Sequence, residues 1–318
     1  MQREALAILN EVRKVIIGKD LVLAKVLMAV LSGGHVLLED VPGVGKTTLA
    51  LSFSKVLGLE YKRVQFTSDS VPSDITGFSV YNKNTGAFEY KPGAAMTNIL
   101  MADEINRTSS KTQSALLEVM EEKQVTVDGI TRKLPDPFFV LATQNPVGSA
   151  GTQMLPNSQM DRFMIKIGMG YPDLKSQINI LKDRHTKNPL DDVQQMIDKE
   201  RLLAMQNHVE SIHIADAVYE YIARLADATR RHSMVQLGVS PRGTLALCRM
   251  AKAYAFVSGR NFVVPEDVCA VLKDVCAHRL ILNPKAKISD VKAADVLDEI
   301  MKSEPMPQIK PVKAEKND

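Results

Sequence analysis

The sequence predicts an α/β fold, in which helices cover both faces of a parallel sheet, followed by a smaller, all-helical domain. Three observations support this prediction. Apolar runs of strand length recur through the first two-thirds of the chain, helical patterns separate several of them, and after residues 171–173 only amphipathic helices follow. Continuous apolar strands joined by helices are typical of a parallel sheet that is buried on both faces. The predicted strands are residues 35–39, 62–66, 98–102, 138–144 and 163–169.

Helical periodicity fills the spaces between several of these strands. Residues 46–57 and 110–121 carry apolar side chains at helical spacing, and a shorter helical pattern surrounds Ser158. These helices supply the crossover connections that parallel strands require.

Two stretches interrupt this alternation and are predicted to be insertions into the α/β core. Residues 67–97 are rich in turn formers, and Asn84-Thr85-Gly86 allows a small hairpin there. Residues 124–132 alternate around Asp128-Gly129, a strong signal for a two-residue hairpin turn.

The remainder of the chain is predicted to be helical. Ser240-Pro241 is a favourable helix start, because serine caps the first turn and proline suits its first position. Residues 303–318 combine Pro305, Pro307 and Pro311 with scattered lysines, which predicts a frayed tail. The predicted helices are residues 216–231, 241–257, 265–280 and 291–301.

Composition excludes several classes of protein. A chain of 318 residues with 45% hydrophobic and 24% charged residues is neither disordered nor collagen-like, and its length suggests two domains. The net charge of 40 − 37 = +3 does not predict a nucleic-acid or anionic-membrane binder. Cys248, Cys269 and Cys276 form no C-x-x-C pair, so we expect free thiols in a reducing compartment. The uncharged stretch at 26–38 is too short to span a membrane, and we expect a cytoplasmic protein.

The strongest chemical signal is a glycine-bearing turn between the strand at 35–39 and the helix at 46–57. Backbone N–H groups of residues 44–48 are expected to surround a phosphate at the helix N-terminus. Lys46 is expected to reach the β- and γ-phosphates, and the Thr47 hydroxyl to ligate Mg²⁺. Gly43 and Gly45 let the backbone approach the phosphate closely.

The motif departs from the full phosphate-loop pattern at one position. Asp40 stands where the pattern G-x-x-x-x-G-K-[ST] has its first glycine. Because this position lies at the end of the strand, before the loop surrounds the phosphate, we expect the departure not to impair binding.

Polar residues also end two other predicted strands. Asp103 and Glu104 follow an apolar strand, and adjacent strand residues point to opposite sides, so the two carboxylates are expected to have different tasks. Asp103 is the candidate for the Mg²⁺ shell, and Glu104 for the general base that polarises the attacking water. At the end of the next strand, Asn145 is the better candidate for a contact to the γ-phosphate or the water, and Thr143 the weaker.

These motifs together resemble those of AAA+ ATPases, and specifically those of the MoxR family. The resemblance covers roughly residues 15–280, with the motifs in the family's order. It is carried by Glu39-Asp-Val-Pro-Gly-Val-Gly-Lys-Thr47, Asp103-Glu-Ile-Asn-Arg107, Ala142-Thr-Gln-Asn-Pro146, Gln159-Met-Asp-Arg-Phe163 and Gly238-Val-Ser-Pro-Arg-Gly243.

The resemblance implies a P-loop NTPase core with a five-stranded parallel sheet in the order 5-1-4-3-2, followed by a small all-α lid domain. We expect the ATPase core at 1–185, with the helix-2 insert at 67–97 and the pre-sensor hairpin at 123–133. The lid is expected at 186–302 and a flexible tail at 303–318.

The resemblance also assigns roles that the residues alone do not give. Asn145 corresponds to sensor 1, Arg162 to an arginine finger that reaches the neighbouring subunit's γ-phosphate, and Arg242 to sensor 2. For Arg107 two interpretations stay open: a position at the subunit interface, or a solvated position on the surface. The expected catalytic residues are Glu104, Lys46, Asn145, Arg162 and Arg242; the nucleotide contacts are Ile17, Gly18, Pro42, Gly43, Val44, Gly45, Lys46, Thr47 and Thr48; and the metal ligands are Thr47 and Asp103.

The expected function is therefore ATP hydrolysis with Mg²⁺ by a chaperone that remodels or matures partner proteins. The resemblance implies a homo-oligomer in the form of a hexameric ring, and clients such as von Willebrand factor A domain proteins or metal-cofactor enzymes. No nucleic acid partner is expected. Two alternatives stay open: a chelatase-type, nucleic-acid or transcription-associated motor on the same scaffold, and an oligomeric scaffold that binds nucleotide without significant hydrolysis.

Overall fold

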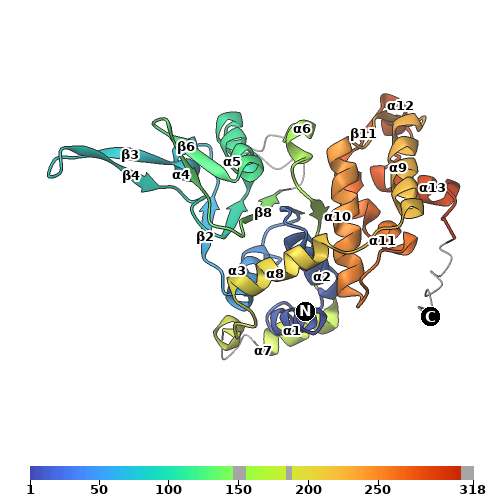
Figure 1. Cartoon of the computed structure of the whole chain (residues 1–318), viewed down its shortest axis with the longest axis horizontal. Helices are drawn as coiled ribbons and strands as arrows, with labels where there is room; N and C mark the ends of the chain where they lie inside the picture. Colours follow the sequence, from blue (N-terminus) through green and yellow to red (C-terminus); the bar gives the residue numbers. More distant parts are fainter. Residues whose placement is uncertain (146–154, 184–187, 309–318) are drawn as a thin grey trace, which may run out of the picture. The chain divides into compact units, whose positions relative to one another are not determined.

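The structure is a computed structural model that describes residues 1–145, 155–183 and 188–308. The chain divides into two compact units, Met1–Glu210 and Ser211–Asp318 (Figure 1). The predicted boundary at 185/186 lies before helix α8 (Lys199–Glu210). The difference arises because α8 packs on α2 (Asp20–Leu31), where the Gln206 side chain donates to the Val30 carbonyl at 2.7 Å.

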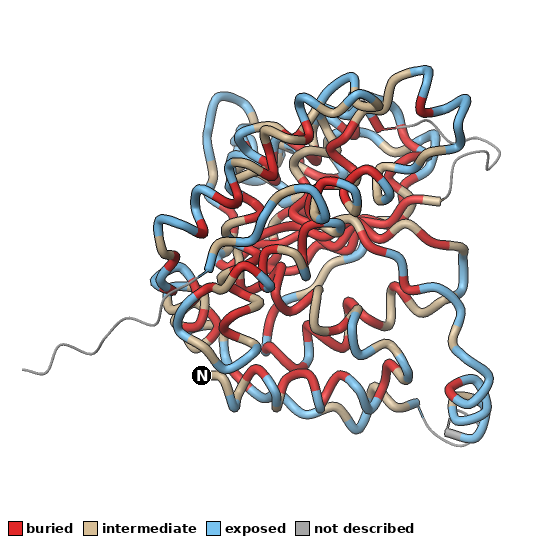
Figure 2. The backbone as a smooth tube through the Cα atoms, turned by 90° about the vertical axis from the view of Figure 1, so that its right-hand side faces the viewer, coloured by how far each residue is buried: buried red, intermediate tan, exposed pale blue. Residues whose placement is uncertain are grey.

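A five-stranded parallel sheet forms the centre of the first unit, in the order β2-β5-β8-β1-β9. Numbered by their order in the chain, these strands lie as 2-3-4-1-5, which confirms the predicted order 5-1-4-3-2 read from the other edge. Buried residues concentrate at the centre of the unit (Figure 2), along β1, β5, β8 and β9, whereas the edge strand β2 is half-buried or exposed. The strands are β1 (Val36–Glu39), β2 (Tyr61–Gln65), β5 (Ile99–Asp103), β8 (Phe139–Gln144) and β9 (Ile165–Ile167).

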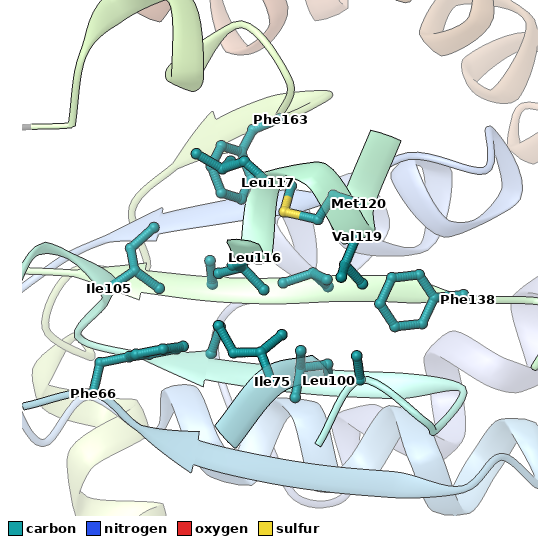
Figure 3. Packing of buried hydrophobic residues seen from close by; sticks show 14 of the residues in the cluster. Phe66, Ile75, Leu100, Ile105, Leu116, Leu117, Val119, Met120, Phe138 and Phe163 are labelled. Atoms are coloured by element: carbon teal, nitrogen blue, oxygen red, sulfur yellow. The ribbon is translucent and has the colours of Figure 1, made fainter. Parts of the chain in front are cut away.

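Helices pack on both faces of this sheet because its central strands are apolar on both sides. In β5 and β8 every residue is buried. Leu100 packs with Leu116 and Met120 of helix α5 (Ser110–Glu122) in one core cluster (Figure 3). Helix α3 (Lys46–Leu57) contacts β5 and packs on α1 (Gln2–Arg13).

Two hairpins interrupt the α/β alternation. The first joins β3 (Gly77–Asn82) to β4 (Ala87–Pro92) and extends away from the sheet (Figure 1). The second joins β6 (Gln124–Val127) to β7 (Ile130–Lys133) through Asp128 and Gly129, both at positive φ (53° and 75°). Such a turn matches the twist of the strands that it connects. The remaining elements of this unit are α4 (Pro72–Thr76), η1 (Ile105–Arg107), α6 (Asn157–Met160), α7 (Leu174–Asp183) and η2 (Pro189–Asp192).

The second unit is built mainly from helices. Ser240 caps helix α10 (Pro241–Val257) by accepting a hydrogen bond from the Gly243 N–H at 3.0 Å. Helix α11 (Pro265–Cys276) packs on α10, and the buried Asp267 carboxylate in its first turn accepts the N–H of Val264, the residue before the helix. The other elements are α9 (Asp216–Arg231), β10 (Val235–Leu237), η3 (Ala277–Arg279), β11 (Ile281–Leu282), α12 (Pro284–Ile288) and α13 (Ala293–Ser303).

The expected tail at 303–318 lies only partly within the described residues. Helix α13 continues to Ser303, and residues 309–318 lie outside the described part of the chain. Among the residues that the structure describes, no helix is both long and apolar enough to cross a membrane.

Candidate functional site

The phosphate loop connects β1 to α3 and presents backbone N–H groups that the helix does not use. Gly43 and Gly45 adopt positive φ values of 84° and 95°. The first intrahelical hydrogen bond runs from the Leu49 N–H to the Gly45 carbonyl at 2.9 Å. The N–H groups that precede Leu49 in the helical turn therefore have no intrahelical acceptor. Together with the helix dipole they form a site suited to an anion such as phosphate.

Lys46 is held against its own loop. Its ammonium group donates to the carbonyls of Asp40 at 2.8 Å and Val41 at 3.3 Å. Burial lowers the pKa of Lys46, and the negative charges of Asp40, Asp103 and Glu104 partly oppose that effect. Strand β1, which leads into the loop, and β5, which leads into the acid pair, both pair with β8, so the two motifs follow the carboxyl ends of strands in the same sheet.

Asp40 has a structural task that the sequence pattern did not reveal. One carboxylate oxygen accepts the N–H groups of Met169 (2.5 Å) and Gly170 (2.6 Å), just after β9, and the other accepts the Val41 N–H at 2.9 Å. A glycine has no side chain to make these bonds. The departure from the phosphate-loop pattern therefore anchors the base of the loop to the neighbouring strand.

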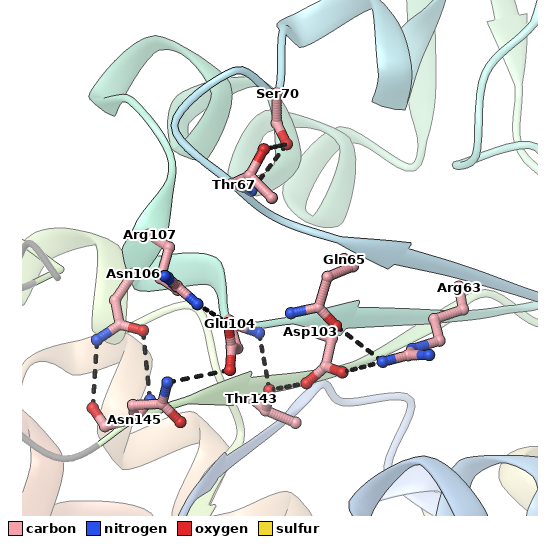
Figure 4. Close-up of polar contacts among 10 residues, drawn as sticks. All are labelled: Arg63, Gln65, Thr67, Ser70, Asp103, Glu104, Asn106, Arg107, Thr143 and Asn145. Carbon is pink, nitrogen blue, oxygen red and sulfur yellow. Dashed lines mark hydrogen bonds and ion pairs between the residues drawn. The ribbon is translucent and has the colours of Figure 1, made fainter. Parts of the chain in front are cut away.

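Asp103 ends β5 with both carboxylate oxygens occupied (Figure 4). Its Oδ1 accepts the Thr143 hydroxyl at 2.5 Å, and its Oδ2 accepts the Arg63 guanidinium at 2.6 Å. The same Thr143 oxygen accepts the backbone N–H of Glu104 at 2.8 Å. Thr143, the weaker of the two candidates that the sequence offers at this strand end, thus joins the two acidic positions.

Glu104 leaves the strand in a left-handed conformation, with φ at 57°. Non-glycine residues adopt this conformation at a cost, and such positions concentrate at functional sites. Its carboxylate accepts the Asn145 amide at 3.1 Å and the Arg107 guanidinium at 2.9 Å (Figure 4). Burial raises the pKa of Glu104, but the hydrogen bonds from Arg107 and Asn145 outweigh it, so the pKa lies below its ordinary value.

A reciprocal pair of hydrogen bonds positions Asn145. The Asn106 amide donates to the Asn145 carbonyl at 3.2 Å, and the Asn145 N–H donates to the Asn106 side chain at 3.3 Å. Asn106 is buried in the short helix η1, so it fixes the end of β8 relative to the end of β5. Pro146, the next residue of the predicted motif, lies outside the described residues.

The segment proposed to contact adenine packs against the chain that follows β9. The Lys19 ammonium group donates to the Tyr171 carbonyl at 2.8 Å. Gly18 has φ at 72°, and a Cβ added there would lie 2.1 Å from the Ser176 hydroxyl oxygen. Ile17 is half-buried. Gly18 is therefore needed for both its conformation and the close approach of Ser176.

The two arginines that the resemblance singled out lie in different units of the chain. Arg162 donates to the Ser158 carbonyl at 3.1 Å and lies 3.7 Å from the Glu121 carboxylate. Arg242 is exposed in the first turn of α10, in the second unit. The described contacts of the first unit bring together Asp103, Glu104, Thr143 and Asn145, while Lys46 contacts the carbonyls of Asp40 and Val41.

Sequence reasoning missed Arg63, Asn106 and the ionic contact of Arg107. Arg63 lies on β2, which pairs with β5, and only the sheet order shows that its side chain reaches Asp103. The position of Arg107 three residues after Glu104, spanning one short turn, is a signal that could have been used.

The oxygen groups at the site suit Mg²⁺ in chemical type. Mg²⁺ favours hard oxygen ligands and keeps several waters, using few protein groups together with phosphate. The Thr47 hydroxyl and the Asp103 carboxylate are such groups. Among the described residues no cluster of three or more histidine, cysteine, aspartate or glutamate side chains forms a dedicated metal cage.

Comparison with known proteins gives consistent results. Residues 35–165 match the family model of ATPases associated with various cellular activities, and residues 227–300 match the AAA lid domain. The Bacillus subtilis "Uncharacterized protein YeaC" is 47% identical over 94% of this chain and 93% of its own length. "Chaperone MoxR1" of Mycobacterium tuberculosis is 38% identical over 95% of this chain and 82% of its own. A crystal structure of a Cytophaga hutchinsonii protein, provisionally assigned as an ATPase, has a TM-score of 0.90 and 37% identity over 96% of each chain.

Proposed function

Because the chain belongs to the MoxR family of AAA+ ATPases, we propose that it hydrolyses ATP in a Mg²⁺-dependent reaction and remodels partner proteins. One observation carries the proposal. The phosphate loop after β1, the acid pair after β5 and the polar end of β8 lie at the carboxyl edge of one parallel sheet. Ligands of open α/β sheets bind at this edge.

The phosphate loop is proposed to bind the triphosphate. Lys46 exchanges the carbonyls of its own loop for phosphate oxygens, whose negative charge offsets the burial that lowers its pKa. The contacting positions are Pro42, Gly43, Val44, Gly45, Lys46, Thr47 and Thr48, with Ile17 and Gly18 beside the adenine.

Thr47 and Asp103 are proposed to hold Mg²⁺, which supplies positive charge that stabilises the transferring phosphoryl group. Glu104 accepts a proton from the attacking water, and its lowered pKa keeps it ionised for that task. Asn145 holds the Glu104 carboxylate through its amide and orients the water or γ-phosphate as sensor 1.

Arg162 is proposed to act on the site of a neighbouring subunit in a hexameric ring. Its contacts to Ser158 and Glu121 leave it at the end of helix α5, apart from the cluster around Lys46. A finger supplied in trans makes turnover depend on assembly. Arg242 is proposed to act as sensor 2 from the first turn of α10.

The proposed clients are proteins, as the name of the chaperone relative suggests, and von Willebrand factor A domain proteins or metal-cofactor enzymes are the classes we favour. A variant that binds ATP but cannot hydrolyse it tests this choice. The Glu104→Gln variant should bind ATP without hydrolysing it and retain clients in a pull-down, whereas the Lys46→Ala variant should retain none.

Phosphate release by the purified chain tests the ATPase itself. We expect Mg²⁺-dependent turnover that both Glu104→Gln and Lys46→Ala abolish, with nucleotide binding lost only in Lys46→Ala. Binding without turnover in the assembled wild-type chain would favour a nucleotide-dependent scaffold. Turnover stimulated by DNA would favour a nucleic-acid motor.

A further inference from the structure

Arg63 occupies the carboxylate that is proposed to face the metal. Its guanidinium lies 2.6 Å from Asp103 Oδ2, while Thr143 donates to the other oxygen (Figure 4). The guanidinium also donates to the Gln65 side chain at 2.8 Å. Arg63 and Gln65 come from the edge strand β2, in parallel register with β5.

The second cation of the site does not share this contact. Lys46 donates to the Asp40 and Val41 carbonyls of the phosphate loop. In this structure the charge of the largely buried Asp103 carboxylate is therefore balanced by a direct ion pair with Arg63. A buried carboxylate without such a partner is costly.

A guanidinium and a metal ion compete for the same carboxylate oxygen because both are cations that need its electron pairs. The Asp103 side chain is only 12% exposed, whereas that of Arg63 is 45% exposed. Asp103 is thus held in place, whereas the Arg63 side chain can move into the adjacent solvent. Water can solvate the half-exposed Arg63 guanidinium after it leaves, and the metal ion then balances the charge of the buried Asp103 carboxylate.

We propose that Arg63 is a place-holding cation: it neutralises Asp103 while the metal is absent and yields Oδ2 when Mg²⁺ binds with nucleotide. The proposal rests on the function proposed above for Asp103. It predicts that Arg63 weakens the linkage between Mg²⁺ and nucleotide binding. A residue that merely orients Asp103 for the metal would strengthen this linkage instead.

The test measures binding of a fluorescent ADP analogue, mant-ADP, to the full chain in excess Mg²⁺ and in EDTA. The ratio of the Kd in EDTA to the Kd in Mg²⁺ reports the linkage without turnover. In Arg63→Gln we expect this ratio to rise about two- to fivefold, the range that an exposed ion pair allows. The Kd in EDTA should stay near the wild-type value.

Two further variants sharpen the result. Arg63→Ala should raise the ratio as Arg63→Gln does, which guards against a folding defect particular to one substitution. Lys83→Gln removes one positive charge at the exposed tip of the β3–β4 hairpin and should leave the ratio unchanged. Mn²⁺ electron paramagnetic resonance of the ADP complexes provides an independent measure of metal affinity.

An unchanged or lowered ratio in both Arg63 variants would overturn the proposal. Failure of the proposed function has a different signature. In that case the wild-type chain would not bind mant-ADP, or its Kd would not depend on Mg²⁺ and Asp103→Asn would change nothing.

Discussion

The hydroxyl of Thr143 donates to Oδ1 of Asp103 at 2.5 Å. It also accepts the Glu104 N–H, so a single buried hydroxyl holds the proposed metal ligand and the backbone of the proposed base. This relation makes Thr143 a positioning residue of the site.

Replacing Thr143 by valine should therefore lower ATP turnover, because valine has nearly the same side-chain shape but lacks the hydroxyl. A hydrogen bond to a charged group contributes about 1.5–3 kcal/mol, which corresponds to a loss of about 10- to 100-fold in kcat. Steady-state phosphate release measures the loss. Thr143→Ser keeps the hydroxyl and should recover most of the rate; a serine variant as slow as the valine variant would contradict this role.

The contact between Arg107 and Glu104 should appear in the pH dependence of turnover. The hydrogen bond from Arg107 lowers the pKa of Glu104, so Arg107→Gln should raise that pKa. The base must be ionised, and the acid limb of the kcat profile should therefore move to higher pH. Lys111→Gln, which removes an exposed charge from helix α5, should leave the limb in place. A shift of the Arg107→Gln limb to lower pH would refute the assignment.

The proposed trans action of Arg162 can be tested by mixing two inactive variants. Arg162→Ala subunits have a complete phosphate loop but no finger, whereas Lys46→Ala subunits have the finger but an impaired loop. If the finger acts in trans, their mixture should regain a measurable fraction of wild-type phosphate release. If the mixture stays as inactive as its components under conditions where subunits exchange, Arg162 acts within its own chain or not at all.

His35 should make the first unit sensitive to acid. Its Nδ1 accepts the Val140 N–H at 2.9 Å and its Nε2 lies 3.1 Å from the Met120 carbonyl, an arrangement that needs a neutral ring. Burial lowers the pKa of His35 from 6.5 to about 4. The unfolded chain therefore takes up a proton first as the pH falls, and stability present above pH 6.5 is lost progressively down to about pH 4. The loss amounts to about 3 kcal/mol at about 1.4 kcal/mol for each pKa unit.

Hydrogen exchange of peptides from β8 measures this effect after correction for intrinsic exchange rates. Protection in His35→Gln should fall less steeply between pH 6.5 and 4 than in the wild-type chain. His213→Gln, at an exposed position, should keep the wild-type slope. Identical slopes in all three proteins would contradict the role of His35.

The ion pair of Arg260 and Asp267 should stabilise the second unit. Asp267 is only 1% exposed, accepts the Val264 N–H at 2.8 Å and pairs with both terminal nitrogens of Arg260. Arg260→Ala leaves this carboxylate buried without its cation, at an expected cost of about 3 kcal/mol. Urea unfolding followed by hydrogen exchange of α11 peptides measures it. The exposed pair of Arg231 and Asp227 is the control, and Arg231→Ala should cost less than about 0.5 kcal/mol.

Much of the first unit was predictable because most strands of its sheet are short apolar runs between turn signals; the edge strand β2 (Tyr61–Gln65) is the polar exception. Each predicted strand overlaps its observed counterpart, as residues 98–102 do with β5 (Ile99–Asp103). Helix α8 was less apparent, because its buried apolar residues are only Leu202, Met205 and Val209. So sparse a pattern does not reveal which unit the helix joins.

The acid pair and the phosphate loop were predictable because each is a local motif. The partners of these residues were not, since they come from other strands. Arg63 and Thr143 each lie 40 residues from Asp103, and their convergence depends on β5 lying between β2 and β8. The separate tasks of Asp103 and Glu104 were expected from strand alternation, whereas in the structure Glu104 turns away because it has already left the strand.

The anchoring of Asp40 has a consequence for how a bound nucleotide is sensed. Asp40 joins the base of the phosphate loop to Met169 and Gly170, and the following residues, Tyr171 and Ser176, hold the segment proposed for adenine. The phosphate loop and the adenine segment would thus both be held by the same stretch of chain, residues 169–176. A substitution at Asp40 would weaken the binding of both the adenine and the phosphates, so the affinities of the protein for ADP and for adenosine would fall in parallel.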